Sequence, residues 1–419
     1  MEKREKTIWE NLDWTTVLLY LLLVFIGWIS IYSAVYDENH SEIFDTTTRY
    51  GKQMIWIGVS LLIATMVILI DPKFFSQTSY IWYGFFLLML IAVLAVGTQT
   101  KGAKSWFMIG SFAIQPSEFA KLATALALSK VLSGFEVDMK ELKTKFYAIL
   151  VIAIPMILVL LQNDTGSALV FFTFIFVLFR QGLSSSILIF GGAIILLFIL
   201  ALLINKYVLV GIIFVIMLLG YLFLRRKLSF WVTLLAFILS SIFVLSVDYF
   251  FNNALESHQK DRIEVLLGQK KDPQGVSYNV NQSKIAIGSG GFLGKGFLKG
   301  TQTKYNFVPE QDTDFIFCTI GEEWGFLGSS LVIAIFVILM VRLIKLAERQ
   351  RSAFSQIYGY CVASIIFVHF TINIGMTMGL LPVIGIPLPF ISYGGSSLIA
   401  FTILLFIFLR QDVSRLELV

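Results

Sequence analysis

Runs of about 20 apolar residues recur along almost the whole chain, and they constrain its fold more than any other feature. Hydrophobic residues make up 57% of the 419 residues and charged residues only 14%, whereas a soluble domain has roughly 25% charged residues. The runs are continuous and lack the alternation of membrane β-strands, which excludes a β-barrel. The sequence therefore predicts an all-α polytopic membrane protein.

Hydropathy divides the chain into about twelve membrane-spanning helices. The predicted spans lie near Trp14–Val35, Lys52–Ile70, Tyr80–Gly97, Pro116–Leu132, Phe146–Leu161, Gly166–Phe179, Ser184–Ile204, Val208–Leu224, Phe230–Phe250, Phe315–Val341, Tyr358–Leu381 and Phe390–Leu409. Twelve basic residues fall in alternate connections and in the tail, as the positive-inside rule requires. They are Lys140, Lys143, Lys145, Arg225, Arg226, Lys227, Arg342, Lys345, Arg349, Arg351, Arg410 and Arg415.

This charge pattern predicts the orientation of the chain. With both termini in the cytoplasm, the acidic first connection, DENHSEIFD, lies outside, and so does a long polar segment at 251–313. Only the outer connection with Lys101 and Lys104 disagrees. The N-terminal MEKREK is followed by a full-length span, so we interpret it as a cytoplasmic tail and not as a cleaved signal peptide.

The polar segment at 251–313 is the only long interruption of the apolar pattern, and we expect the reactive carboxylate in it. Asp272 stands out because the surrounding Lys-Lys-Asp-Pro-Gln-Gly is typical of an exposed turn. The residues alone leave the other carboxylates as alternatives: Asp261, Glu264, Glu310, Asp312, Asp314, Glu322 and Glu323.

Glycines in the same segment suggest close approach of the backbone to another surface. GSGGFLGKG is not a phosphate-binding loop, because Lys295 is followed by Gly296 and not by Ser or Thr. We expect these glycines to let the backbone approach a ligand or the membrane closely. Asn279–Ile287 has the pattern of a short amphipathic helix on the outer surface.

Ionisable groups inside predicted spans are functional candidates. Glu118 and Lys121 open the fourth span and share one face; Lys121 can meet a phosphate from outside, or the two can form an ion pair that only stabilises the bundle. Trp106 is either an interfacial anchor or a binding residue, and Asp164 either caps a helix or binds a ligand. The polar Gln-Asn-Asp-Thr-Gly around Asp164 indicates either a cavity-lining break or a tight hairpin.

Other kinds of site find little support. Cys318 and Cys361 both fall in predicted spans, so no disulfide framework is implied. The three histidines, His40, His258 and His369, lack the spacing of a metal site. The basic residues are explained by membrane topology, so no nucleic-acid partner is expected.

A set of motifs does indicate a family. PSEFAK, KGAKSW, QNDTGSAL, DPQGVSYNVNQSKIAIGSGGFLGKGFLKGTQT, FVPEQDTDFIF and GIPLPFISYGGSS, spread from about Gly102 to Ser397, together resemble the SEDS family (shape, elongation, division and sporulation). The resemblance is greater to its elongation branch than to its division branch. It implies a peptidoglycan glycosyltransferase that polymerises lipid II at the outer face of the bacterial cytoplasmic membrane. The implied partners are a class B penicillin-binding protein and other membrane proteins of the elongation complex.

The resemblance also implies roles for individual residues. The essential loop aspartate of the family corresponds to Asp272, which becomes the expected catalytic base. The implied substrate-binding residues are Trp106, Glu118, Lys121, Asp164, Lys104, Gln282 and Lys284. The chain departs from the family pattern at Ser105, Asn163, Thr165 and Asp312, where the family often has Arg, Pro, Leu and His.

The family has ten spans, so we interpret residues 184–227 as an inserted helix pair within a single domain covering residues 1–419. A bound Mg²⁺ or Mn²⁺ is expected as an aid to the departing pyrophosphate, with no metal ligands identified. Two alternatives from other classes are a lipid II flippase and a scaffold that only activates the penicillin-binding protein.

Overall fold

The computed structural model describes residues 8–36, 45–100, 102–110, 112–134, 138–224, 229–253, 257–266, 276–305 and 307–415. Asp272 and Lys101 lie outside these residues. The chain divides into two compact units, one formed by Met1–Leu183 with Tyr278–Val419 and the other by Ser184–Ser277.

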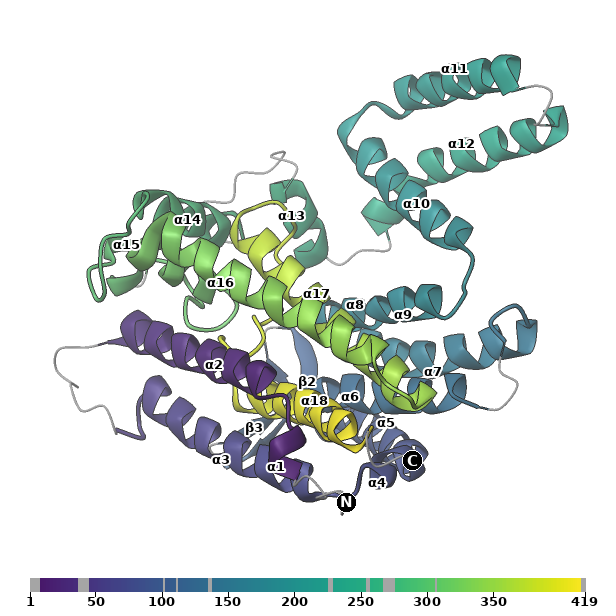
Figure 1. Cartoon of the computed structure of the whole chain (residues 1–419). Coiled ribbons are helices and arrows are strands. Elements are labelled where there is room, and N and C mark those ends of the chain that lie inside the picture. Colours follow the sequence, from purple (N-terminus) through teal and green to yellow (C-terminus); the bar gives the residue numbers. More distant parts are fainter. Residues whose placement is uncertain are drawn as a thin grey trace. The chain divides into compact units, whose positions relative to one another are not determined.

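The first unit contains most of the helices (Figure 1). They are α1 (Ile8–Asn11), α2 (Trp14–Val35), α3 (Arg49–Leu69), α4 (Pro72–Gln77), α5 (Ser79–Val96), α6 (Pro116–Leu132), α7 (Leu142–Leu161), α8 (Thr165–Val170), η1 (Phe171–Thr173), α9 (Phe174–Arg180), α14 (Val276–Ser289, from Tyr278 onward in this unit), α15 (Thr301–Lys304), α16 (Ile316–Glu348), α17 (Ala353–Thr377) and α18 (Gly395–Ser414). The all-α polytopic class predicted from the sequence is confirmed.

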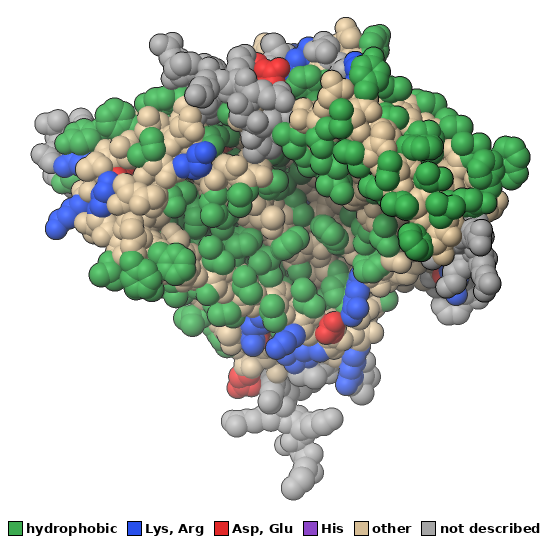
Figure 2. All heavy atoms as spheres, turned by 90° about the horizontal axis from the view of Figure 1, so that it is seen from above, with side chains coloured by type: hydrophobic (Ala, Val, Ile, Leu, Met, Phe, Trp, Pro, Cys, Tyr) green, Lys and Arg blue, Asp and Glu red, His purple; other side chains and the backbone are tan. Residues whose placement is uncertain are grey.

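Ten helices of the described chain are long and apolar enough to cross a membrane. Two further segments of the predicted set are shorter: α6 has 17 residues, and Thr165–Arg180 is interrupted by the 3₁₀ turn η1. Every predicted span thus has a helix at its position, while the number that cross the membrane stays a prediction. Hydrophobic side chains cover broad areas of the surface, as lipid contact requires (Figure 2).

Buried positions identify the central helices of the first unit. In α17 and α18, 72% and 83% of the most apolar window is buried, against 17% in α5 and in α7. Most residues of α6 are also buried, although it is the least apolar of the central helices. Its many Ala and Ser residues have small side chains, which let neighbouring helices approach closely in a membrane.

Polar residues at the helix starts follow ordinary capping chemistry. Asp13 caps α2 by accepting from the Thr16 amide at 3.1 Å, and Asp71 caps α4 by accepting from the Lys73 amide at 2.7 Å. Asp13 also accepts from Arg342 Nε of α16 at 2.8 Å. Burial raises the pKa of Asp13, but the hydrogen bonds from Arg342 and Thr16 outweigh it and leave the pKa below its usual value.

The connection between α5 and α6 is a small antiparallel sheet that the sequence analysis did not predict. Its strands are β1 (Thr98–Thr100), β2 (Ala103–Ile109) and β3 (Phe112–Ile114), in the order β1-β2-β3. The β1–β2 pairing places Thr98 opposite Trp106, and Gly102 takes a φ of +88° at the turn.

The second unit contains α10 (Ser185–Leu203), α11 (Lys206–Leu224), α12 (Phe230–Asn253) and α13 (Ser257–Leu266). A small apolar core joins α10, α11 and α12 through Ala201, Leu209, Ile213, Val244 and Val247. The unit begins at Ser184, where the predicted inserted pair begins, and continues to Ser277. The insertion itself stays a prediction.

Candidate functional site

The polar segment at 251–313 is more ordered than a long irregular loop. Its described residues include α13, α14 and α15, and α14 covers the helix expected at Asn279–Ile287. Asp272 lies outside the described residues, so the expected catalytic base is not placed.

Glu322, near the start of α16, binds the connection between α14 and α16, which forms the C-terminal part of this segment. Its carboxylate is fully buried and accepts hydrogen bonds from the backbone amides of Thr301 at 2.7 Å, Gln302 at 2.9 Å and Thr303 at 2.9 Å. Lys295 adds an ion pair at 2.7 Å. A buried carboxylate needs such partners to offset its lost hydration. Glu322 therefore organises the connection and is not a free base.

Glycines allow this connection to lie against the backbone of α16. A Cβ on Gly294 would come within 2.1 Å of the Glu323 carbonyl oxygen, and one on Gly290 within 2.0 Å of the Gly321 carbonyl oxygen. α16 itself is broken at Gly325, where φ is +63° and ψ is −155°. The expected close approach of backbone exists, but its partner is α16 and not a ligand or the membrane.

Glu323 is the neighbouring carboxylate and is only half satisfied. Its Oε1 accepts hydrogen bonds from the Ser33 hydroxyl and, at 3.1 Å, from the Leu298 amide. Its Oε2 is buried without a hydrogen-bond partner in the described part of the chain. Buried polar atoms usually have partners, so this oxygen is an open acceptor beside the connection.

Asp312 stands where the family often has His, and it forms a different contact. Both of its carboxylate oxygens accept from Arg49 Nη1 at 2.7 Å. Its carbonyl oxygen accepts from the Tyr393 amide at 2.9 Å, which ties this connection to the loop before α18. Burial raises the pKa of Tyr393, although the Arg49 charge acts in the opposite direction. Asp312 thus links α3 to the loop before α18.

Glu118 and Lys121 form the ion pair expected from their spacing, with Nζ 2.8 Å from Glu118 Oε1. The pair is buried, with exposed fractions of 4% and 2%. His369 of α17 places Nε2 2.9 Å from Lys121 Nζ, and its Nδ1 lies 3.2 Å from the Pro387 carbonyl oxygen. Glu118 Oε2 has no partner among the described residues. The stabilising pair is observed, and phosphate binding by Lys121 stays a prediction.

Asp164 caps α8, as one of its two interpretations stated. Its side chain accepts from the Ser167 amide at 3.0 Å and from Gln115 Nε2, at the start of α6, at 2.9 Å. The preceding turn is a tight hairpin with Asn163 at a φ of +59°. The break within the second short span lies further on, at η1. Asp164 therefore connects α8 to α6, and a role in binding substrate stays untested.

The remaining expected binding residues lie on the sheet and on α14. Lys104 donates its Nζ to the Ala95 carbonyl oxygen at 2.8 Å, which ties β2 to the end of α5. Trp106 is half-buried on β2. On α14, Gln282 is half-buried, and the exposed Lys284 extends its stem over Gly379, where an added Cβ would lie 3.2 Å from it. These contacts place the residues without testing what they bind.

His369 is a polar residue of the Glu118–Lys121 cluster that the sequence analysis considered only as a possible metal ligand. It is 1% exposed and lies 248 positions from its partner Lys121. The only sequence signal was a titratable residue within a predicted span, which is a functional candidate by default. In the described residues no group of three or more His, Cys, Asp or Glu side chains could hold a metal ion, and both cysteines are free and buried.

These features define a class of protein: a multi-pass helical membrane protein with a buried ionic cluster and a folded polar connection clamped onto a broken helix. A family model described as "Cell cycle protein", for FtsW, RodA and SpoVE, matches residues 13–209 and 192–416. The chain therefore belongs to the FtsW/RodA/SpoVE family, the SEDS proteins.

Individual relatives match over nearly their whole length. The chain is 33% identical over 398 residues to the peptidoglycan glycosyltransferase MrdB of Escherichia coli K12, covering 94% of this chain and 92% of the relative. It is 31% identical to the peptidoglycan glycosyltransferase RodA of Treponema pallidum, covering 93% and 94%. A chain in a solved structure on polymerization and crosslinking by a peptidoglycan synthase complex matches with a TM-score of 0.67 and 28% identity, covering 96% and 98%.

Proposed function

We propose that this protein is a peptidoglycan glycosyltransferase that polymerises lipid II during cell elongation. The observation that carries the proposal is the whole-length similarity to curated peptidoglycan glycosyltransferases, with 94% of this chain matched. The reaction takes place at the outer face of the bacterial cytoplasmic membrane, with both termini in the cytoplasm. The crosslinking partner is a class B penicillin-binding protein, in keeping with the peptidoglycan synthase complex that contains a similar chain.

The chemistry needs a base and a way to stabilise the leaving group. In chain growth a sugar hydroxyl attacks the anomeric carbon of the growing glycan, and undecaprenyl pyrophosphate leaves with inversion of configuration. A carboxylate that accepts the hydroxyl proton contributes typically about 10²–10⁴-fold. We assign that role to Asp272. Lys121 is proposed to face the pyrophosphate, whose developing charge needs a cation placed in advance.

The structure of the outer connections supports this assignment by the partners it gives to two of the competing carboxylates. Glu322 is held by three backbone amides and Lys295, and Asp312 is held by Arg49. Neither oxygen pair is free to take up a proton from a sugar hydroxyl without losing these contacts. The contacts of Glu322 with Lys295 and with the amides of 301–303 instead fix the C-terminal part of the 251–313 segment, the segment to which Asp272 belongs.

A divalent cation remains an expectation. The described residues contain no group of three or more potential ligands, so a Mg²⁺ or Mn²⁺ ion would depend on phosphate oxygens, water and one or two carboxylates. Such an ion would help to neutralise the leaving pyrophosphate; the assigned roles of Asp272 and Lys121 do not depend on it.

The test compares three purified variants in a lipid II polymerisation assay read as glycan chains on gels, with lipid II binding measured in parallel. Asp272→Asn should lose nearly all product while it retains binding. Asp272→Glu should keep little activity, because a displacement of about 1 Å can reduce the rate by about 10²-fold. Asp261→Asn is the matched control and should polymerise. Full polymerisation by Asp272→Asn would remove this residue as the base; transport of lipid II without polymerisation by wild-type protein would favour the flippase.

A further inference from the structure

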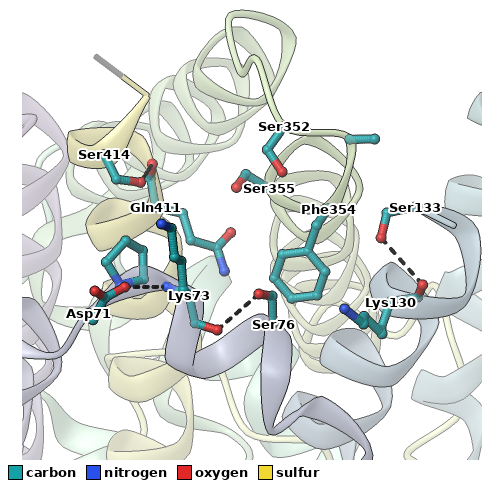
Figure 3. Close-up of a pocket in the computed structure, with 12 residues that line it drawn as sticks. Asp71, Lys73, Ser76, Lys130, Ser133, Ser352, Phe354, Ser355, Gln411 and Ser414 are labelled. Atoms are coloured by element: carbon teal, nitrogen blue, oxygen red, sulfur yellow. Dashed lines mark hydrogen bonds between the residues drawn. The ribbon is translucent and has the colours of Figure 1, made fainter. Parts of the chain in front are cut away.

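A pocket at one end of the helix bundle contains none of the candidate catalytic or substrate-binding residues described above. It has a volume of about 410 Å³ and lies where α4, the end of α6, the start of α17 and the end of α18 meet (Figure 3). Its lining residues are Asp71, Pro72, Lys73, Ser76, Lys130, Ser133, Ser352, Ala353, Phe354, Ser355, Gln411 and Ser414. All four segments belong to the first unit.

Two cations face this pocket, and neither has a partner among the described residues. Lys73 of α4 and Lys130 of α6 approach it from different sides (Figure 3), and neither side chain makes a hydrogen bond or ion pair with any described residue. Asp71 is the only carboxylate among the lining residues, and it accepts from the Lys73 amide in its role as helix cap. The lining therefore has a net charge of +1, from two lysines and one aspartate.

The start of α17 adds hydrogen-bond donors. Ser352 is the N-cap of this 25-residue helix, yet its side chain makes no capping hydrogen bond. The first backbone hydrogen bond into the helix is from the Gln356 amide to the Ser352 carbonyl oxygen, so the amides of the first turn remain available. The hydroxyl of Ser355 also makes no hydrogen bond within the described chain. Helix N-termini of this kind attract anions.

Gln411 gives independent evidence for a ligand. It is 2% exposed, and both Oε1 and Nε2 of its side chain lack hydrogen-bond partners in the described chain. Figure 3 shows its amide directed into the pocket between Lys73 and Phe354. A buried amide without partners is costly unless a ligand or water satisfies it. The neighbouring Asp412 is not a partner for the Gln411 amide, because Arg349 and Arg415 already bind its carboxylate.

We propose that this pocket binds a phosphate-bearing anion, held by Lys73, Lys130, the first turn of α17 and the Gln411 amide. α17 begins and α18 ends at the pocket, and both are long and apolar enough to cross a membrane, so the pocket is expected at the level of the lipid head groups. In the predicted orientation this end faces the cytoplasm, where basic pockets between helices bind anionic head groups. The same chemistry would accept a soluble phosphate monoester.

The test uses full-length protein purified in detergent and stripped of lipid. The probes are dioleoyl-phosphatidylglycerol, zwitterionic dioleoyl-phosphatidylcholine and soluble glycerol 3-phosphate, with binding measured by native mass spectrometry and by thermal shift. Wild-type protein should bind phosphatidylglycerol, glycerol 3-phosphate or both in preference to phosphatidylcholine. Preference for the lipid identifies a head group as the source, and saturable binding of glycerol 3-phosphate identifies a soluble phosphate.

The variants decide whether the pocket is responsible. Lys73→Gln with Lys130→Gln should weaken binding by about tenfold for each lysine removed, since charge-assisted contacts of this kind are each worth about one order of magnitude. Lys140→Gln with Lys143→Gln removes the same charge from exposed residues outside the pocket and should bind as wild type. Equal loss in both double variants, or no loss in either, would overturn the proposal.

A second variant addresses the pocket without changing its charge. Gln411→Met keeps the volume but removes the unpartnered amide, so the lipid-free protein should melt at the same or a higher temperature. Its affinity for the bound phosphate probe should nevertheless fall by about tenfold. Unchanged affinity in Gln411→Met would show that the amide does not contact the ligand, and would contradict the proposed site.

Discussion

Glu322→Gln tests whether one buried carboxylate holds the outer connection on α16. The substitution keeps the size of the side chain but replaces one acceptor oxygen with an NH₂ group. Glu322 Oε1 accepts from Lys295, Thr301 and Gln302, and Oε2 accepts from Thr303. Whichever oxygen is replaced, at least one backbone amide then faces another donor inside a fully buried site.

The expected magnitude follows from these contacts. Hydrogen bonds to a charged group contribute about 1.5–3 kcal/mol each, and an unsatisfied buried donor costs about 1–3 kcal/mol. Neutralising the carboxylate and leaving one amide unsatisfied should reduce the free energy of local opening by about 3 kcal/mol. That change corresponds to about a hundredfold larger population of the opened connection.

Hydrogen exchange with mass spectrometry measures this population directly. Peptides covering 298–305 should exchange about a hundredfold faster in Glu322→Gln, whereas those from the centre of α17 should not change. Glu348→Gln is the control, because its ion pair with Arg180 is solvent-exposed and should contribute about 0–1 kcal/mol. Wild-type exchange at 298–305 in Glu322→Gln would refute the reasoning.

Three further predictions follow from the structure. Lys121→Met should destabilise the protein by about 3–5 kcal/mol, because it leaves the Glu118 carboxylate buried and unpaired. Adding Glu118→Gln should restore the melting temperature, and polymerisation that stays lost in this double variant would indicate a role in substrate binding. Gly294→Ala should lower the stability of the protein by about 2 kcal/mol, because φ is +82° and the new Cβ meets a carbonyl oxygen. Gly288 has open space around it, so Gly288→Ala should raise the stability by about 0.5–1 kcal/mol, and thermal unfolding compares the two variants. Because the pKa of Asp13 is lowered in the folded protein, its carboxylate stabilises the fold above the unfolded pKa of about 3.9, and this contribution is lost as the pH falls through the folded value. The melting temperature of Asp13→Asn should therefore depend less on pH below about 4 than that of wild type.

Several features of this protein were determined by the sequence alone. Apolar runs of membrane length admit only helices, because a bilayer supplies no hydrogen bonds to the backbone, and each predicted span has a helix at its position. Local interactions could also be predicted: the three-residue spacing predicted the Glu118–Lys121 ion pair, and the position of Asp164 before a helix predicted that it caps this helix. The motif set identified the family. The helices, the ion pair and the cap depend on interactions between residues close in the chain or on the solvent itself.

Tertiary structure decided the contacts between distant residues. Lys121 gains His369 from 248 positions away, and Arg49 reaches Asp312 across 263 positions, neither of which any local pattern predicts. The glycines of GSGGFLGKG indicated a close approach, but only the packed chain shows that the approached surface is α16. The pocket around Gln411 likewise exists because α4, the end of α6, the start of α17 and the end of α18, which are far apart in the sequence, come together. A sequence shows which groups need partners, whereas the packing of the helices selects which partners they receive.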